Sequence, residues 1–285
     1  MTKIEIPEIN FVKEIPSSFD EMSSDDYIRF IKLWMGVQNK LHDVNYLKTE
    51  LVFHFLNIKH SPFRWQRLSE DEKLLISSNI NYIATHLDFL VSERDVDGKI
   101  HVGIPLTWTK NHIPEYRGLK GPADALADIT WIEYKDAMMA AIDYIENEDV
   151  DDLARLVAIL YRKKYLFSKR RRAYDPERVS QIMKKTKKIP FPTLYGIFLF
   201  FLSCEKYIRE GTFTVDREEI SFSSLFKKSD GADEGSNGTW MTELLYNLAE
   251  TGVFGNAKET SRQNLFDILF RLYQVHKDYK RRMKK

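Results

Sequence analysis

The sequence predicts a mainly α fold, a globular multi-helix body with minor β elements. Apolar residues recur at spacings of three and four along most of the chain, which is the helical pattern. Capping boxes, in which Ser or Thr precedes an acidic residue by three positions, recur at the predicted helix starts. Only 12 of the 285 residues are Gly, which argues against a fold rich in tight β-turns. Since hydrophobic residues make up 43% and charged residues 30%, the chain can bury a core.

Residues 1–95 are predicted to form an N-terminal extended arm followed by helices. In the first 16 residues, Ile4 and Ile6 share one face of a short strand, and Pro7 and Pro16 interrupt it. This arm either caps its own domain or reaches a neighbouring subunit.

Three helices are predicted after the arm. Ser23 and Asp26 resemble a capping box with Asp in place of Glu, and Ser69 and Glu72 form a complete one. Each helix has an apolar stripe at helical spacing. The stripes are Tyr27, Phe30, Ile31 and Trp34; Val44, Leu47, Leu51, Phe55 and Ile58; and Ile76, Ile80, Ile83, Leu87 and Leu90.

Residues 96–226 are predicted to be a central helical region with a loop-rich entry. Apolar residues alternate strictly from Ile100 to Trp108, so residues 100–108 form a strand; because Pro105 lacks an amide donor, this is an edge strand or a loop. Residues 111–122 read as a loop. Four helices are predicted next. The first begins at a predicted Thr130–Glu133 capping box, the second covers 153–160, and the third begins at Asp175–Pro176. The fourth covers 193–209 and is expected at the centre of the core. Residues 213–222 are predicted to form a small hairpin.

Residues 239–285 are predicted to form a C-terminal helical pair after a loop at 227–238, although all three regions also fit one continuous domain. The pair comprises helices at 239–250 and from about 258 to the end. The last helix has an unusually broad apolar face, formed by Leu265, Phe266, Ile268, Leu269, Leu272, Tyr273, Val275, His276 and Tyr279. Either it packs within its own domain on two sides, or one side meets another chain.

The familiar catalytic motifs are absent from the sequence. There is no phosphate loop, dinucleotide-binding glycine pattern, nucleophile elbow or zinc-binding motif, and the single cysteine, Cys204, lies in an apolar stretch. We therefore expect no enzyme activity, catalytic residue, cofactor or metal; only His101 and His112, on either side of Trp108, would support an unfamiliar active site. No signal peptide is evident, and the longest apolar run has nine residues where a membrane span needs about 20. The chain is thus expected to be soluble.

Charge is segregated along the chain although the formal net charge is only +1. Residues 143–152 contain six acidic residues and no basic one, whereas 162–188 contain 12 Lys or Arg against Asp175 and Glu177, a net of +10. Residues 277–285 contain six Lys or Arg against Asp278. The basic segment is a solvated surface that pairs with the preceding acidic turn, a nucleic-acid contact, or a docking site for an acidic partner. Its interleaved aromatic residues, Tyr165, Phe167 and Tyr174, would suit stacking.

Several stretches carry a family resemblance: Ile15–Met22, Gly121–Leu126, Asp128–Tyr134, Leu156–Arg162, Leu248–Gly255 and Asn264–Leu269. Together they resemble uncharacterised proteins of tailed bacteriophages and prophages, chiefly of the Bacteroidetes group. The resemblance implies a role in tail or virion assembly, other phage structural or assembly proteins as partners, and a location in the bacterial host cytoplasm during assembly or in the virion. It implies no catalytic residue.

The sequence therefore favours a non-enzymatic phage structural or assembly protein, of the tail-assembly chaperone or virion connector type, that acts through protein surfaces. Self-association into a homo-oligomer is compatible with this role. The expected interaction residues are Trp108, Leu265, Leu269, Leu272, Tyr273 and Tyr279. The alternative is a nucleic-acid-binding accessory protein that uses residues 162–188, with phosphate contacts from Lys169, Arg170, Arg171 and Arg172.

Overall fold

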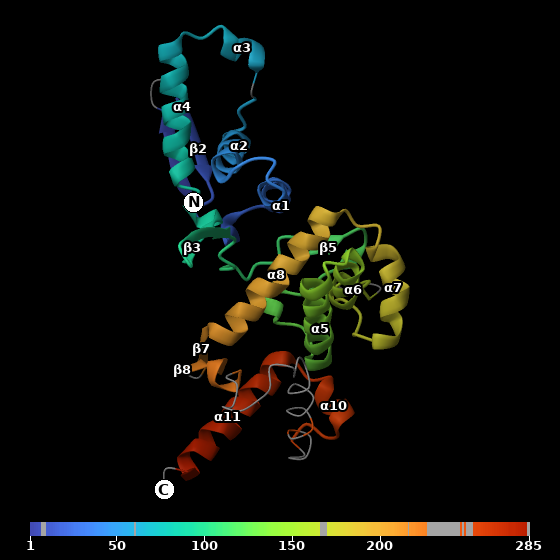
Figure 1. Ribbon diagram of the computed structural model, residues 1–285. Coiled ribbons are helices and arrows are strands. Elements are labelled where there is room, and N and C mark those ends of the chain that lie inside the picture. The colour runs from blue at the N-terminus through green and yellow to red at the C-terminus, as the bar shows by residue number, and fades with distance from the viewer. Residues whose placement is uncertain are drawn as a thin grey trace. The chain divides into compact units, whose positions relative to one another are not determined.

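The computed structural model describes residues 1–6, 10–59, 61–165, 170–215, 217–226, 246, 248 and 253–283 (Figure 1). The chain forms two compact units, Met1–Trp108 and Thr109–Lys285. The boundary between them follows Trp108, where the sequence predicts one after residue 95; the predicted boundary across 227–238 lies outside the described residues. The predicted mainly α class with minor β elements is confirmed.

The N-terminal arm is a β-hairpin that packs on its own unit. Strand β1 (Thr2–Ile6) pairs antiparallel with β2 (Phe11–Ile15), so that Thr2 lies opposite Ile15. The side chain of Ile15 is fully buried, and β2 contacts helix α2 (Val44–Leu56). Of the two roles predicted for the arm, the structure has the one in which it caps its own domain.

The helices of the first unit begin where the capping residues predict. Both boxes are complete, at Ser23 before α1 (Ser24–Gln38) and at Ser69 before α4 (Glu70–Thr85). A short helix, α3 (Pro62–Gln66), and two 3₁₀ turns, η2 (Phe19–Glu21) and η3 (Asp88–Leu90), complete the helical part. The apolar stripe of α1 is buried as predicted.

The predicted strand at 100–108 is shorter than the alternation suggests. Strand β3 (Ser92–Val96) pairs with β4 (Lys99–Gly103), and β4 ends two residues before Pro105. Because proline has no amide hydrogen to donate, the ladder does not continue through it. The alternation beyond Gly103 therefore reflects an irregular segment, not a strand.

In the second unit, helix α6 (Val150–Leu160) lies among three other helices. It contacts α5 (Trp131–Asn147), α7 (Val179–Thr186) and α8 (Phe191–Glu210), and Figure 1 shows α5, α6 and α7 side by side. Helix α8 is buried over most of its first 14 residues, which confirms its predicted place in the core. Asp175 caps a 3₁₀ turn, η5 (Pro176–Arg178), that leads directly into α7.

Short hairpins and turns connect these helices. Strands β5 (Glu115–Tyr116) and β6 (Leu119–Lys120) pair within the predicted loop at 111–122, before the 3₁₀ turn η4 (Asp124–Leu126). The predicted hairpin at 213–222 is confirmed: β7 (Thr212–Val215) pairs with β8 (Glu218–Ser221), before the 3₁₀ turn η6 (Phe222–Leu225).

The prediction of one continuous last helix from about residue 258 is wrong, because the helix is interrupted before Asn264 and a new one begins after it. Helices α10 (Ala257–Ser261) and α11 (Leu265–Met283) flank this residue. The Asn264 side chain accepts a hydrogen bond from the amide of Phe266 and donates one to the carbonyl of Ala127, so it starts a new helix and ties it to the segment before α5.

The predicted loop at 227–238 and helix at 239–250 lie outside the described residues, apart from Tyr246 and Leu248, which are helical. Within the ranges given above, the structure contains no helix that is both long enough and apolar enough to cross a lipid bilayer.

Candidate functional site

A large pocket opens in the second unit, and the predicted basic segment forms much of its wall. Its volume is about 1350 Å³. Residues of α5, α6 and α7, the segments 162–165 and 170–178, and the turn after α10 line it. The wall contains nine Lys or Arg side chains but only three carboxylates, those of Asp128, Glu133 and Asp175.

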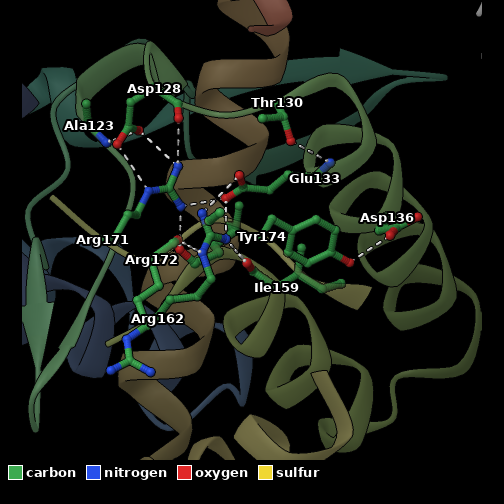
Figure 2. A network of polar contacts seen from close by, with 12 residues as sticks. Ala123, Asp128, Thr130, Glu133, Asp136, Ile159, Arg162, Arg171, Arg172 and Tyr174 are labelled. Atoms are coloured by element: carbon green, nitrogen blue, oxygen red, sulfur yellow. Dashed lines mark hydrogen bonds and ion pairs between the residues drawn. The ribbon is translucent and has the colours of Figure 1, made fainter. Parts of the chain in front are cut away.

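Two buried arginines converge on Glu133 (Figure 2), which is one of the residues that line this pocket. Arg162 donates to both carboxylate oxygens of Glu133, at 2.8 and 3.1 Å, and Arg171 donates to Oε1 at 2.5 Å. Arg171 also donates to both carboxylate oxygens of Asp128, at 3.1 and 3.0 Å. The Glu133 and Arg171 side chains are only 1% and 4% exposed, so this pair forms away from solvent, whereas the Asp128 side chain is 43% exposed.

The network departs from the predicted capping box at the start of α5. Thr130 caps the helix, since its hydroxyl accepts a hydrogen bond from the amide of Glu133. The Glu133 carboxylate does not close the box, because both its oxygens are bound to the buried arginines. An ion pair stabilises a buried guanidinium group more than the second hydrogen bond of a capping box stabilises a helix end.

An antiparallel pair of segments, which we call the basic ribbon (residues 163–165 and 170–172), forms one wall of the pocket. Lys164 pairs with Arg171, the amide of Tyr165 donates to the carbonyl of Arg170, and the amide of Arg172 donates to the carbonyl of Lys163. Side chains alternate between the two faces of such a ribbon. Lys163, Tyr165, Arg170 and Arg172 therefore share one face and are exposed, whereas Arg171 lies on the other face and is buried. All five residues line the pocket.

Arg162 fixes the ribbon to the helices beneath it. Its Nε donates to the carbonyl of Arg172 at 2.7 Å, and its Nη1 donates to the carbonyl of Ile159 at 2.6 Å. Burial lowers the pKa of this guanidinium, and the neighbouring Glu133 carboxylate opposes that shift. The arginine therefore serves as a structural cation, and the exposed face of the ribbon has a defined position.

Tyr174 extends the network toward α5. Its ring lies 5.5 Å from the Arg162 guanidinium, and its hydroxyl donates to the Asp136 carboxylate at 2.6 Å. Burial and this hydrogen bond raise the pKa of the Tyr174 phenol, so the phenol stays protonated and donates a hydrogen bond. This tyrosine is half-buried and serves to hold the pocket wall.

The wall keeps an excess of positive charge after its ion pairs are formed. Glu133 and Asp128 pair with Arg162 and Arg171, and Asp175 pairs with Arg178 at 3.0 Å. Each carboxylate of the wall is therefore bound to an arginine of the same wall. Four other cations are exposed and have no ion-pair partner in the part of the chain that the structure describes: Lys163, Arg172, Lys185 and Arg262.

The acidic segment at 143–152 neutralises little of this charge. Asp143 and Asp152 pair with Arg155 within the same helical hairpin, and Asp151 pairs with Lys187 at 2.5 Å. The predicted pairing of the basic segment with the preceding acidic turn thus holds for Lys187, which does not line the pocket.

Of the four phosphate-binding residues that the sequence predicts, the structure places two in the pocket wall with exposed side chains, Arg170 and Arg172. Arg171 is a correction: its side chain is buried in ion pairs and is not available to a ligand. Lys169 lies outside the described residues. Lys163, Lys185 and Arg262 also line the pocket with exposed side chains, and the sequence did not single them out.

Most of the predicted interaction residues are core residues. Trp108 has no exposed surface and stacks on Phe19 with ring centroids 4.3 Å apart, and Leu265, Leu269 and Leu272 are buried within the second unit. Their expected role as surface anchors is therefore corrected. Tyr273 is half-buried beside Phe222, and Tyr279 is 60% exposed.

His101 and His112 differ in their surroundings. His101 lies in β4 of the first unit and is exposed, whereas His112 is 2% exposed within the second unit. The His112 imidazole is therefore not accessible from solvent. Among the described residues, no group of three His, Cys, Asp or Glu side chains is arranged to hold a metal ion.

Comparison with known proteins gives no relative. No family model, curated protein or solved structure matches the chain. The role in phage assembly that the sequence resemblance implies therefore stays a prediction, and so does the expected lack of enzyme activity.

Proposed function

We propose that this protein binds nucleic acid through the pocket of its second unit. The observation that carries the proposal is the unneutralised positive charge of the pocket wall, concentrated on Lys163, Arg172, Lys185 and Arg262. Most protein contacts to nucleic acid go to phosphate oxygens, and Arg and Lys are their main donors. The proposal corresponds to the nucleic-acid alternative that the sequence leaves open for residues 162–188.

The arrangement of the cations suits a chain of phosphates. The four residues come from three separated parts of the sequence: the basic ribbon, α7 and the turn after α10. They surround one volume of about 1350 Å³, which is larger than the roughly 300–1,000 Å³ typical of small-molecule pockets. A polymer with regularly spaced negative charges can reach several of these cations at once.

The buried ion pairs support the proposal because they fix the backbone of the pocket wall before a ligand binds. Arg162 holds the backbone carbonyl of Arg172, so the exposed Arg172 side chain starts from a fixed position. Preorganised cations lose less conformational entropy when they bind a ligand. An acidic protein surface is the competing ligand, and the experiment separates the two.

The experiment compares two triple variants by titration of a fluorescent oligothymidylate at several salt concentrations. The pocket variant carries Arg172→Gln, Lys185→Gln and Arg262→Gln. The control carries Lys184→Gln, Lys188→Gln and Lys258→Gln, which are also exposed but do not line the pocket. Both lose three charges, so long-range attraction falls equally, and Lys184 and Lys185 are neighbours on α7.

We expect the pocket variant to bind more weakly and to lose about 2 from the slope of log affinity against log salt, since each single-strand phosphate contact contributes about 0.7. The control variant should keep the wild-type slope. Equal slopes in the two variants would contradict the proposal. So would polyglutamate binding as tightly as the oligonucleotide, because that result would point to an acidic protein partner.

A further inference from the structure

Tyr165 is an exposed aromatic ring that the basic ribbon holds in place. Its backbone amide donates to the carbonyl of Arg170 at 3.0 Å, and its hydroxyl accepts a hydrogen bond from the amide of Ala173 at 3.3 Å. The residue is nevertheless 49% exposed and lines the pocket. Large aromatic side chains usually bury most of their surface, so an ordered ring left half in water is available to a ligand.

The ring lies among cations on the same face of the ribbon. Tyr165 and Lys163 are two residues apart in one segment, and Arg170 and Arg172 lie opposite them in the other. Side chains on one face of an antiparallel pair are near neighbours, so phosphate-binding and stacking groups alternate over a short distance. Single strands are typically bound by this combination of a basic groove and aromatic platforms.

The pocket also offers apolar surface that a base can cover. Ile132, Ala158 and Ile182 line it together with the charged residues. In a duplex, the faces of the bases are stacked on one another and cannot contact a protein ring, whereas an unpaired base can leave the stack and lie on an aromatic side chain.

From these observations we infer that the nucleic acid taken by this pocket is single-stranded, with one unpaired base stacked on Tyr165 while the neighbouring phosphates contact Lys163 and Arg172. The inference rests on the proposed function and specifies its ligand. Tyr165 supplies an uncharged contact, so it contributes to affinity and not to salt dependence.

The test measures the binding of three probes: an oligothymidylate, a strand with the same number of phosphates but no bases, and a duplex of equal length. The variants are Tyr165→Ala, Tyr165→Phe, which keeps the ring, and Tyr165→Leu, which keeps apolar bulk without it. The matched control is Tyr46→Ala, because Tyr46 is 50% exposed and does not line the pocket. Circular dichroism establishes that each variant is folded.

We expect the single strand to bind more tightly than the duplex. Tyr165→Ala and Tyr165→Leu should weaken oligothymidylate binding about fivefold or more, with an unchanged salt slope and no loss on the strand without bases. Tyr165→Phe and Tyr46→Ala should bind like the wild type.

Equal binding of duplex and single strand, or an equal loss on both single-stranded probes, would overturn this inference. The proposed function would still stand if the pocket triple variant of the preceding section lost its phosphate contacts. If that variant also behaved like its control, the proposed function would fail and this inference with it.

Discussion

Glu133 accepts a hydrogen bond from Arg162 on each of its carboxylate oxygens, at 2.8 and 3.1 Å. This bidentate pair joins the first turn of α5 to the residue that directly precedes the basic ribbon. Arg162 also donates a hydrogen bond to the backbone carbonyl of Arg172. The position of the exposed Arg172 side chain therefore depends on the Glu133 carboxylate, which is 1% exposed. The fold and the proposed ligand contacts are therefore linked through one buried ion pair.

Glu133→Gln should destabilise the protein strongly. The change leaves two buried guanidinium groups with less negative charge than they need, and breaking a buried pair on one side costs about 3–5 kcal/mol. Urea unfolding measures the loss of free energy of unfolding. Glu177→Gln, at an exposed position, is the control and should change it by less than about 0.5 kcal/mol. A Glu133→Gln protein as stable as this control would show that the network does not hold the fold.

Two adjacent arginines should respond in opposite ways to substitution by alanine. Arg171→Ala removes a side chain that is 4% exposed and pairs with Asp128 and Glu133, so we expect a loss of several kcal/mol in the free energy of unfolding. Arg172→Ala removes an exposed side chain and should cost less than about 0.5 kcal/mol. Oligonucleotide binding should show the reverse, with a loss in folded Arg172→Ala. Similar stabilities of the two variants would contradict the assignment of the ribbon's faces.

Asp26 should make the first unit sensitive to acid. Burial raises the pKa of this carboxyl, but hydrogen bonds from Ser23 and the contact with His54 outweigh burial and hold it below 3.8. A carboxyl with a lowered pKa in the folded state stabilises the fold above its unfolded-state pKa, and this contribution is lost as pH falls through the folded-state pKa.

We therefore expect Asp26→Asn to lower the free energy of unfolding near pH 6 by about 1 kcal/mol, the usual net value of a hydrogen bond. Near pH 3 the difference from the wild type should shrink. Urea titrations at the two pH values measure it. A difference that stayed constant or grew in acid would contradict the role given to the Asp26 charge.

Helix α11 should separate core residues from surface residues. Leu269 is 1% exposed, so Leu269→Ala should cost about 2–5 kcal/mol of unfolding free energy through lost packing and the cavity left behind. Tyr279 is 60% exposed, and Tyr279→Ala should cost less than about 0.5 kcal/mol. Thermal or urea unfolding of both variants decides the point. A small change in unfolding free energy for Leu269→Ala would contradict its assignment to the core and support its predicted role as a surface anchor.

The helices and their starts follow well from the sequence because their causes are local. Ser23 and Ser69 cap the amides three residues ahead, and the stripe from Tyr27 to Trp34 is buried as its spacing predicts. The break at Asn264 was missed because its cause is not local: the side chain binds the carbonyl of Ala127, which is far away in the sequence.

The site was predicted only in outline. The run of basic residues is visible in the sequence, but the difference between Arg171 and Arg172 depends on which residues pair across the ribbon. The ion pairs of Glu133 with Arg162 and Arg171 were not predicted, because the position of Glu133 three residues after Thr130 had been interpreted as part of a capping box. Three consecutive arginines give no pattern of residue type that tells which of them faces inward.

Cross-linking tests the central claim most directly, because it locates the nucleic acid on the protein. An oligonucleotide that carries a photoreactive iodouracil is irradiated with the full chain, and the linked peptides are identified by mass spectrometry. We predict cross-links within residues 162–178, centred on Tyr165. Cross-links confined to the basic end of α11, at residues 277–282, or to the first unit would contradict the assignment of the pocket as the nucleic-acid site.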